Sequence, residues 1–202
     1  MPLDFTNLDL SVMEPARRSA GLLEYGRHFV QIYEDDASLV EAVATFLSLG
    51  ISAGDAGIVI AHDDHIAAFE EHLVWAGVDL HEARVKGLLK TLNSHDLLAR
   101  FMLNGMPDRS LFMESVGGLV LSAASVGNIR VFGEMVADLW AEGRMPAVMK
   151  LEELWNELAS TCTLELFCAY PAGSFHDSEL VALSQVCRMH SQVIPPTGQA
   201  RT

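Results

Sequence analysis

The chain has 202 residues, half of them hydrophobic, and its 27 acidic and 13 basic residues give a formal net charge of −14. This length suits one domain with a core large enough to fold without metal or disulfide support. Because the negative field repels phosphate groups, we expect neither direct nucleic-acid binding nor attachment to an anionic membrane surface.

Strands alternate with helices from residue 28 onward. Five strands are expected, at residues 28–33, 56–61, 88–92, 128–132 and 163–170. Seven helices are expected to begin at Asp35–Asp36, His62, Ser94, Asp108, Glu134, Pro146 and Ser178. This order predicts a three-layer α/β domain, a parallel sheet with helices on both faces.

The ends of the domain are set by composition. Residues 1–24 have a mixed pattern and are interpreted as a tail or an added helix, and the domain is expected to span residues 25–196. Gly50 and Gly54 are expected to close the first helix and the loop after it. Two prolines end the ordered chain, which leaves residues 197–202 as a disordered tail.

The cysteines and the apolar segments bear on the cellular compartment in which the protein is expected. Cys162, Cys168 and Cys187 form no Cys-x-x-Cys pair, so neither a disulfide framework nor a zinc knuckle follows, and Cys168 is interpreted as a buried thiol. Residues 1–10 lack the apolar core of a signal peptide, and no apolar stretch approaches the length of a membrane span. We therefore expect a cytoplasmic protein.

A ligand site is expected where the parallel strands end, because open parallel sheets bind ligands at that edge. Glu134, after a central strand, has two interpretations: a charge aimed into the crevice, or an acid that favours the start of the next helix. Trp140 stands at a helical spacing that is more often found in a core. The candidate ligand-binding residues are Tyr33, Glu34, Asp35, Asp36, His62, Glu134, Trp140 and Tyr170.

Nucleotide binding and catalysis are not expected. The turn after the first strand, residues 33–39, contains neither glycine nor lysine, so it lacks a Walker A phosphate loop, and its acids already occupy the positive end of the helix dipole. The chain also lacks the G-x-S-x-G nucleophile elbow. We identify no catalytic residue.

Two groups of metal-ligand or nucleophile type receive other interpretations. His62-Asp63-Asp64-His65 resembles a metal cluster, but neighbouring residues at a helix start are expected to fan outward, so a solvated helix start is favoured and no metal site is predicted. Cys187 and His190 stand three residues apart and could touch. Without a third orienting group, a packed thiol is favoured.

Ordered sequence blocks resemble the MEDS domain, a sensory domain named from methanogens and methylotrophs. The blocks are His28-Phe29-Val30-Gln31-Ile32-Tyr33-Glu34-Asp35-Asp36, Phe132-Gly133-Glu134-Met135-Val136 with Leu139-Trp140, Leu151-Glu152-Glu153-Leu154-Trp155-Asn156, Phe167-Cys168-Ala169-Tyr170-Pro171, and Val186-Cys187 with His190-Ser191 and Val193-Ile194-Pro195. The resemblance covers about residues 26–196.

The resemblance implies a RecA-like fold, similar to P-loop ATPases, with a degenerate phosphate loop. MEDS domains often accompany histidine kinases or DNA-binding domains and sense small molecules, whereas this chain has no room for such an output domain. We therefore expect a stand-alone bacterial signalling module that binds an unidentified small molecule and relays to a partner protein, such as a histidine kinase or a transcription regulator. The alternative is a non-catalytic interaction or oligomerisation scaffold. Homo-oligomerisation is favoured, since RecA-like domains often assemble, and no cofactor is identified.

Overall fold

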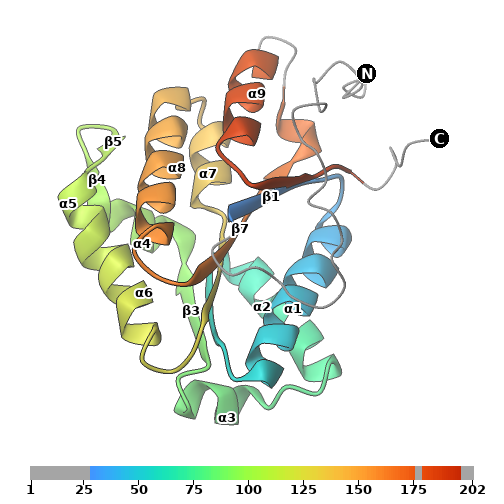
Figure 1. Ribbon diagram of the computed structural model, residues 1–202. Helices are drawn as coiled ribbons and strands as arrows, with labels where there is room; N and C mark the ends of the chain where they lie inside the picture. The colour runs from blue at the N-terminus through green and yellow to red at the C-terminus, as the bar shows by residue number, and fades with distance from the viewer. Residues whose placement is uncertain (1–27, 176–178, 197–202) are drawn as a thin grey trace.

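A parallel six-stranded sheet forms the centre of the protein in a computed structural model that describes residues 28–175 and 179–196 (Figure 1). The strands lie in the order β3-β2-β6-β7-β1-β8, and every neighbouring pair is parallel. Their bounds are β1 His28–Tyr33, β2 Ala56–Ala61, β3 Leu89–Asn93, β6 Ile129–Gly133, β7 Leu164–Pro171 and β8 Gln192–Ile194. The predicted parallel sheet is confirmed.

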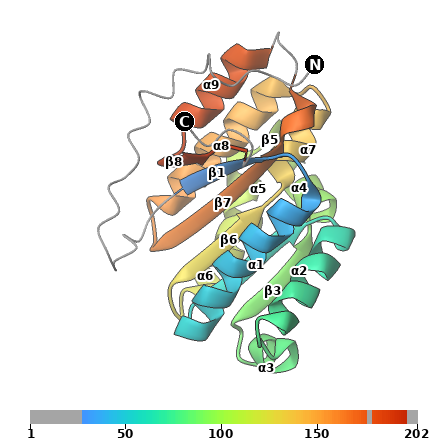
Figure 2. The same ribbon diagram turned by 90° about the vertical axis from the view of Figure 1, so that its right-hand side faces the viewer.

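Helices cover both faces of the sheet (Figure 2). One face carries α1 (Asp36–Ala53), α2 (Asp63–Trp75) and α3 (Leu80–Val85). The other face carries α4 (Ser94–Phe101), α5 (Arg109–Phe112), α6 (Gly118–Ala123), α7 (Met135–Ala141), α8 (Met145–Ala159) and α9 (Leu180–Arg188). This division follows from right-handed crossovers, which place helices on opposite faces when the chain moves in opposite directions along the sheet.

Alternation along the strands divides the core between the two faces. On β7, Cys168 and Tyr170 face the layer of α7–α9, whereas Phe167 and Ala169 face the layer of α1–α3. All six residues of β2 are buried because helices cover both its faces. The continuous apolar run at residues 56–61 therefore predicted this strand correctly.

Several elements were not predicted from the sequence. They are the short helix α3, the small hairpin of β4 (Met102–Leu103) and β5 (Met106–Pro107), the π-helical turn Met113–Gly117 between α5 and α6, the 3-10 turn Ala172–Ser174, and the edge strand β8. Each is six residues long or shorter, which is too short for a pattern of 3.6 or 2 residues to emerge. Residues 1–24 and 197–202 lie outside the described residues, so their predicted roles stay predictions.

Gly50 does not end the first helix, as was predicted, but lies within α1. The side chain of Arg130 passes so close that a Cβ at position 50 would collide with its Cδ. Gly54, with φ of 87°, is the residue that ends the helix in the left-handed conformation. A glycine inside a helix can thus mark a close approach as well as a stop.

Helix α1 has the length and composition of a membrane span, with 18 residues and a mean hydropathy of 1.3. This corrects the expectation that no apolar stretch approaches that length. Leu39, Val43 and Leu47 are fully buried against the sheet, which accounts for the apolar composition of a core helix.

Candidate functional site

The carboxyl ends of β2 and β6 form a topological switch point of the sheet. The two strands are neighbours, with Ile60 paired to Gly133, yet the helices that follow them, α2 and α7, lie on opposite faces of the sheet. Diverging helices leave a crevice at such a switch point, and the residues just after the strands line it. We call His62, His65, His95, Glu134 and Asp138 the carboxyl-edge cluster.

Glu134 links the two sides of this crevice. Its side chain is buried, and its Oε2 accepts a hydrogen bond from the backbone N–H of His62 at 2.9 Å, while its Oε1 contacts His65 Nδ1. The carboxylate makes no capping bond to its own helix, α7. The carboxylate thus lies between the two strand ends, and its place directly before α7 remains compatible with the helix-dipole interpretation.

His62 and His65 point to the same place, which corrects the expectation that this helix start fans outward. Their rings stack with centroids 6.0 Å apart, because residues three apart lie on one side of a helix. His62 Nε2 lies 2.7 Å from Asp138 Oδ1, and the His95 ring stacks on His62 at 4.9 Å. The spacing of three residues was the signal that could have predicted this convergence.

The acids at this edge shift the pKa of two neighbouring groups. The hydrogen bond with Glu134 raises the pKa of His65, and the charges of Glu134 and Asp36 add to the effect. Burial raises the pKa of Tyr33, and Glu134, Asp36 and Asp138 raise it further. The crevice therefore favours protonated and hydrogen-bond-donating groups.

The structure brings some candidate residues together and separates others. Asp36 Oδ1 lies 3.7 Å from His65 Nε2, although the Asp36 side chain is 74% exposed. Asp35 caps α1, its Oδ1 accepting from the N–H of Ser38 at 2.8 Å, and Glu34 is exposed beside it.

Trp140 and Tyr170 do not join this crevice. Both are buried in the core between the sheet and the layer of α7–α9, where their rings meet edge to face at 5.6 Å. Tyr170 pairs with Ile32 in the ladder between β7 and β1, so it shares a face with Ile32 and not with Tyr33. The strand end was predicted correctly, but the face was not.

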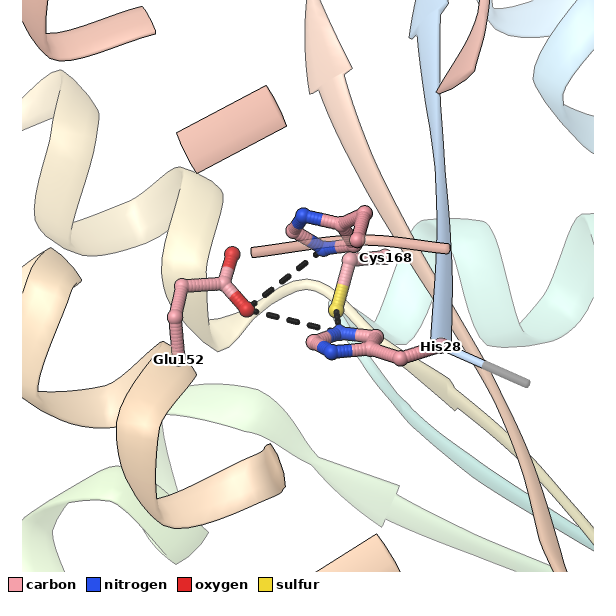
Figure 3. Close-up of side chains that lie close together, drawn as sticks. His28, Glu152 and Cys168 are labelled. Atoms are coloured by element: carbon pink, nitrogen blue, oxygen red, sulfur yellow. Dashed lines mark hydrogen bonds and ion pairs between the residues drawn. The ribbon is translucent and has the colours of Figure 1, made fainter. Parts of the chain in front are cut away.

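A second polar group lies inside the layer of α8 and α9, and we call His28, Glu152, Cys168 and His190 the buried cluster (Figure 3). All four side chains are buried, and each offers one ligand-type atom within 4.8 Å of the others. His28 Nε2 lies 3.2 Å from Cys168 Sγ and 3.4 Å from Glu152 Oε2. His190 Nε2 lies 3.5 Å from the same Glu152 oxygen.

Four elements position the buried cluster. His28 begins β1, Cys168 lies in the adjacent β7, Glu152 projects from α8, and His190 follows α9. The backbone oxygen of His28 accepts from the N–H of Ser191 at 2.7 Å, which holds the start of β1 beside the end of α9. The Tyr170 hydroxyl donates to Glu152 Oε1 at 2.7 Å.

Burial dominates the protonation of this cluster. It lowers the pKa of His28 to about 4, helped by the adjacent His190, and lowers that of His190 to about 4. It raises the pKa of Glu152 and of the Cys168 thiol. Cys168 is therefore a buried thiol, as predicted, and unsuited to nucleophilic attack.

A surface pocket of about 380 Å³ reaches the buried cluster. It is lined by His28, Asn156, Ala159, Ser160, Met189, His190 and Ser191. The buried cluster was missed from the sequence, since its four members are scattered over more than 160 residues and only the folded sheet brings them together.

Two comparisons identify the fold and the family. The structure of the flagellar accessory protein FlaH from Methanocaldococcus jannaschii is similar, with a TM-score of 0.56 at 10% identity, over 87% of this chain and 73% of that one. At this identity the similarity shows the fold alone, which is RecA-like. A search of curated proteins gives no match. The family model described as the methanogen/methylotroph, DcmR sensory domain matches residues 27–191, and the chain therefore belongs to the MEDS family.

Proposed function

We propose that this protein is a sensory module that binds a small molecule at the carboxyl-edge cluster and passes the signal to a protein partner. Membership of a sensory-domain family supports the sensory role. The observation that carries the site is Glu134, a buried carboxylate that follows β6 but is bonded to the start of α2. A ligand that binds the Glu134 carboxylate would replace its hydrogen bond to the start of α2 and so change the contact between α2 and α7.

The chemistry of the crevice favours a neutral or cationic ligand with hydrogen-bond donors. Glu134, Asp138 and Asp36 supply carboxylate oxygens around His62 and His65. The His62 side chain is 38% exposed, so the cluster is accessible from solvent. A phosphate group would meet like charge here, which argues against a nucleotide.

Helix α2 is the proposed relay. It begins at the cluster with His62 and His65 and ends about 20 Å away, by the rise of 13 helical residues. At that far end Val74 is 52% exposed and Trp75 is 70% exposed. Exposed apolar side chains of this size suit a contact with a partner protein. The three free cysteines agree with a reducing compartment such as the cytoplasm.

The exposed Val74 and Trp75 equally favour a second function, a non-catalytic interaction or oligomerisation scaffold. Native mass spectrometry of protein purified from cell extract separates the two. A retained small-molecule mass that is lost in Glu134→Gln, and kept in the matched exposed variant Glu41→Gln, supports the sensor. A bare polypeptide in a defined oligomer, unchanged by Glu134→Gln, contradicts it and favours the scaffold.

A further inference from the structure

The buried cluster poses a problem of hydrogen-bond polarity. Asn156 Nδ2 donates to the carbonyl of Met189 at 3.1 Å, so Asn156 Oδ1 faces His28 Nδ1 at 3.0 Å. An amide oxygen only accepts, and His28 Nδ1 must therefore carry the proton. His190 Nδ1 lies 2.8 Å from the carbonyl of Val186 and carries a proton for the same reason.

Both Nε2 atoms are therefore bare in the neutral histidines, and both face Glu152 Oε2. Tyr170 occupies the other carboxylate oxygen, Oε1. Glu152 Oε2 and His190 Nε2 are fully buried and have no hydrogen-bond partner among the described residues. Lone pairs of two imidazoles and a carboxylate thus converge, with the sulfur of Cys168 beside them, and such an arrangement needs either a bound cation or protons shared between these atoms.

The distances suit a metal ion. Ligand atoms ~2.0–2.3 Å from a tetrahedral zinc ion lie ~3.3–3.6 Å from one another. In the buried cluster Glu152 Oε2 lies 3.4 Å from His28 Nε2 and 3.5 Å from His190 Nε2, both within this range. Cys168 Sγ lies 3.2 Å from His28 Nε2, so zinc binding would move these two atoms slightly apart, and all four ligand atoms lie within 4.8 Å of one another. Two imidazoles, one thiolate and one carboxylate form a donor set that zinc accepts.

From these contacts we propose that His28, Glu152, Cys168 and His190 bind one Zn²⁺ ion in a closed tetrahedral site. The thiolate and the carboxylate balance the two positive charges, so no net charge is buried. Three of the ligands have a second hydrogen-bond partner that fixes their orientation, as is usual at metal sites. His28 Nδ1 donates to Asn156 Oδ1, His190 Nδ1 donates to the carbonyl of Val186, and Glu152 Oε1 accepts from the Tyr170 hydroxyl. The pocket at His28 and His190 supplies the access route.

This site differs from the carboxyl-edge cluster in position and role. With four protein ligands it leaves no open coordination position, which is typical of zinc that stabilises a fold. It would clamp β1, β7, α8 and the end of α9 together. The competing arrangement is a proton network in which the Cys168 thiol donates to His28 and a protonated Glu152 donates to His190.

Cobalt titration distinguishes the two arrangements. The full chain is stripped with chelator and titrated with Co²⁺. We expect one equivalent to bind, with visible bands of tetrahedral cobalt and a near-ultraviolet thiolate-to-cobalt band. Zn²⁺ should displace the Co²⁺. Cys168→Ser should abolish the thiolate band, whereas the matched variants Cys187→Ser and Cys162→Ser should keep it, and Asn156→Ala should weaken binding by about 10–100-fold.

X-ray absorption of the wild-type cobalt protein serves where Cys168→Ser fails to fold, and a sulfur neighbour at ~2.3 Å is expected. The proposal is overturned if Co²⁺ gives no tetrahedral spectrum, or if no sulfur neighbour is found. It is equally overturned if binding survives Cys168→Ser but is lost in His65→Gln, because the ion would then occupy the carboxyl-edge cluster. Success, or the absence of a tetrahedral spectrum or of a sulfur neighbour, leaves the small-molecule proposal untouched, since that is tested through Glu134. Only an ion at the carboxyl-edge cluster bears on both proposals.

Discussion

The hydroxyl of Tyr170 donates to Glu152 Oε1 at 2.7 Å inside the core, with both side chains fully buried. Removing the hydroxyl leaves a buried carboxyl oxygen without its donor. We expect Tyr170→Phe to lower the free energy of unfolding of metal-free protein by about 1–3 kcal/mol, measured by urea denaturation. Tyr33→Phe is the matched control, because the Tyr33 hydroxyl makes no hydrogen bond to the described part of the chain. Equal losses in the two variants would refute the role given to this bond.

Arg130 is buried near the amino ends of β2 and β6, at the sheet edge opposite the carboxyl-edge cluster. Its Nε lies 3.2 Å from Asp55 Oδ2, its Nη1 donates to the Phe46 carbonyl at 3.1 Å, and its guanidinium lies over the Phe46 ring. Its Nη1 also lies 3.4 Å from Oε2 of the buried Glu165. Arg130→Met leaves the buried Asp55 and Glu165 carboxylates without their counter-charge, so a loss of about 3–5 kcal/mol is expected in urea denaturation.

Arg109→Met provides the comparison for Arg130→Met, because Arg109 pairs with Glu157 on the surface. Surface ion pairs contribute little to stability, so this variant should unfold near the wild-type urea midpoint. A small effect at both arginines would mean that the Asp55 pair is not a buried charge pair in solution.

His28 and His190 should remain neutral in metal-free folded protein down to pH values near 4, where burial places their pKa. The unfolded chain takes up these protons from about pH 6.5 downward. Since the unfolded state binds more protons between pH 6.5 and 4, the histidines' contribution to stability is lost as the pH falls through that window. Nitrogen-15 NMR of the imidazoles, assigned with His28→Gln and His190→Gln, measures both values.

Glu152 acts in the opposite direction. Its raised pKa means that the folded protein keeps a proton that the unfolded chain releases, so this contribution is lost as the pH rises. With two histidines against one carboxyl, we expect a net loss of stability on acidification below pH 6.5. In Glu152→Gln the free energy of unfolding should still fall on acidification, because the two histidines remain. If His28 and His190 titrate at ordinary histidine pKa values, they are not buried as neutral rings.

Millimolar ATP with Mg²⁺ should not raise the melting temperature. The start of α1, where a phosphate loop would lie, already holds the Asp35 carboxylate on the Ser38 N–H, with Asp36 in the first turn. A ligand bound only to the folded state raises the melting temperature by mass action. A shift that saturates with ATP, and that is absent with Mg²⁺ alone, would show that nucleotide binding survives in this chain.

The sequence predicted the layers of the fold better than it predicted side-chain direction. Continuous apolar runs such as Ala56–Ala61 identify a buried strand by themselves, because both of its faces are covered. Tyr170 shows the limit: its face depends on pairing with Ile32 across two strands that are distant in the chain. The buried cluster has no local pattern, since His28 and His190 meet only when α9 packs beside β1.

The spacing of three residues between His62 and His65 is visible in the sequence. The group on which the two side chains converge, Glu134, follows another strand and could not be identified from that spacing. Charge alone therefore indicated the edge of the sheet where these side chains converge, without giving the set of residues. In the same way, the sequence predicted a helix end at Gly50. A glycine is needed there because the Arg130 side chain, 80 residues away in the chain, passes against it.

The family boundary at residue 191 falls one residue before β8, and this has a practical consequence. The three residues Gln192–Ile194 pair with Phe29, Val30 and Gln31 and cover the outer backbone of β1 beyond His28, whose carbonyl is bonded by Ser191. A protein shortened to that boundary would present the amides and carbonyls of β1 as an open edge. Such an edge invites strand addition from a second molecule, so the shortened domain should precipitate or form fibrils where the longer chain remains dispersed.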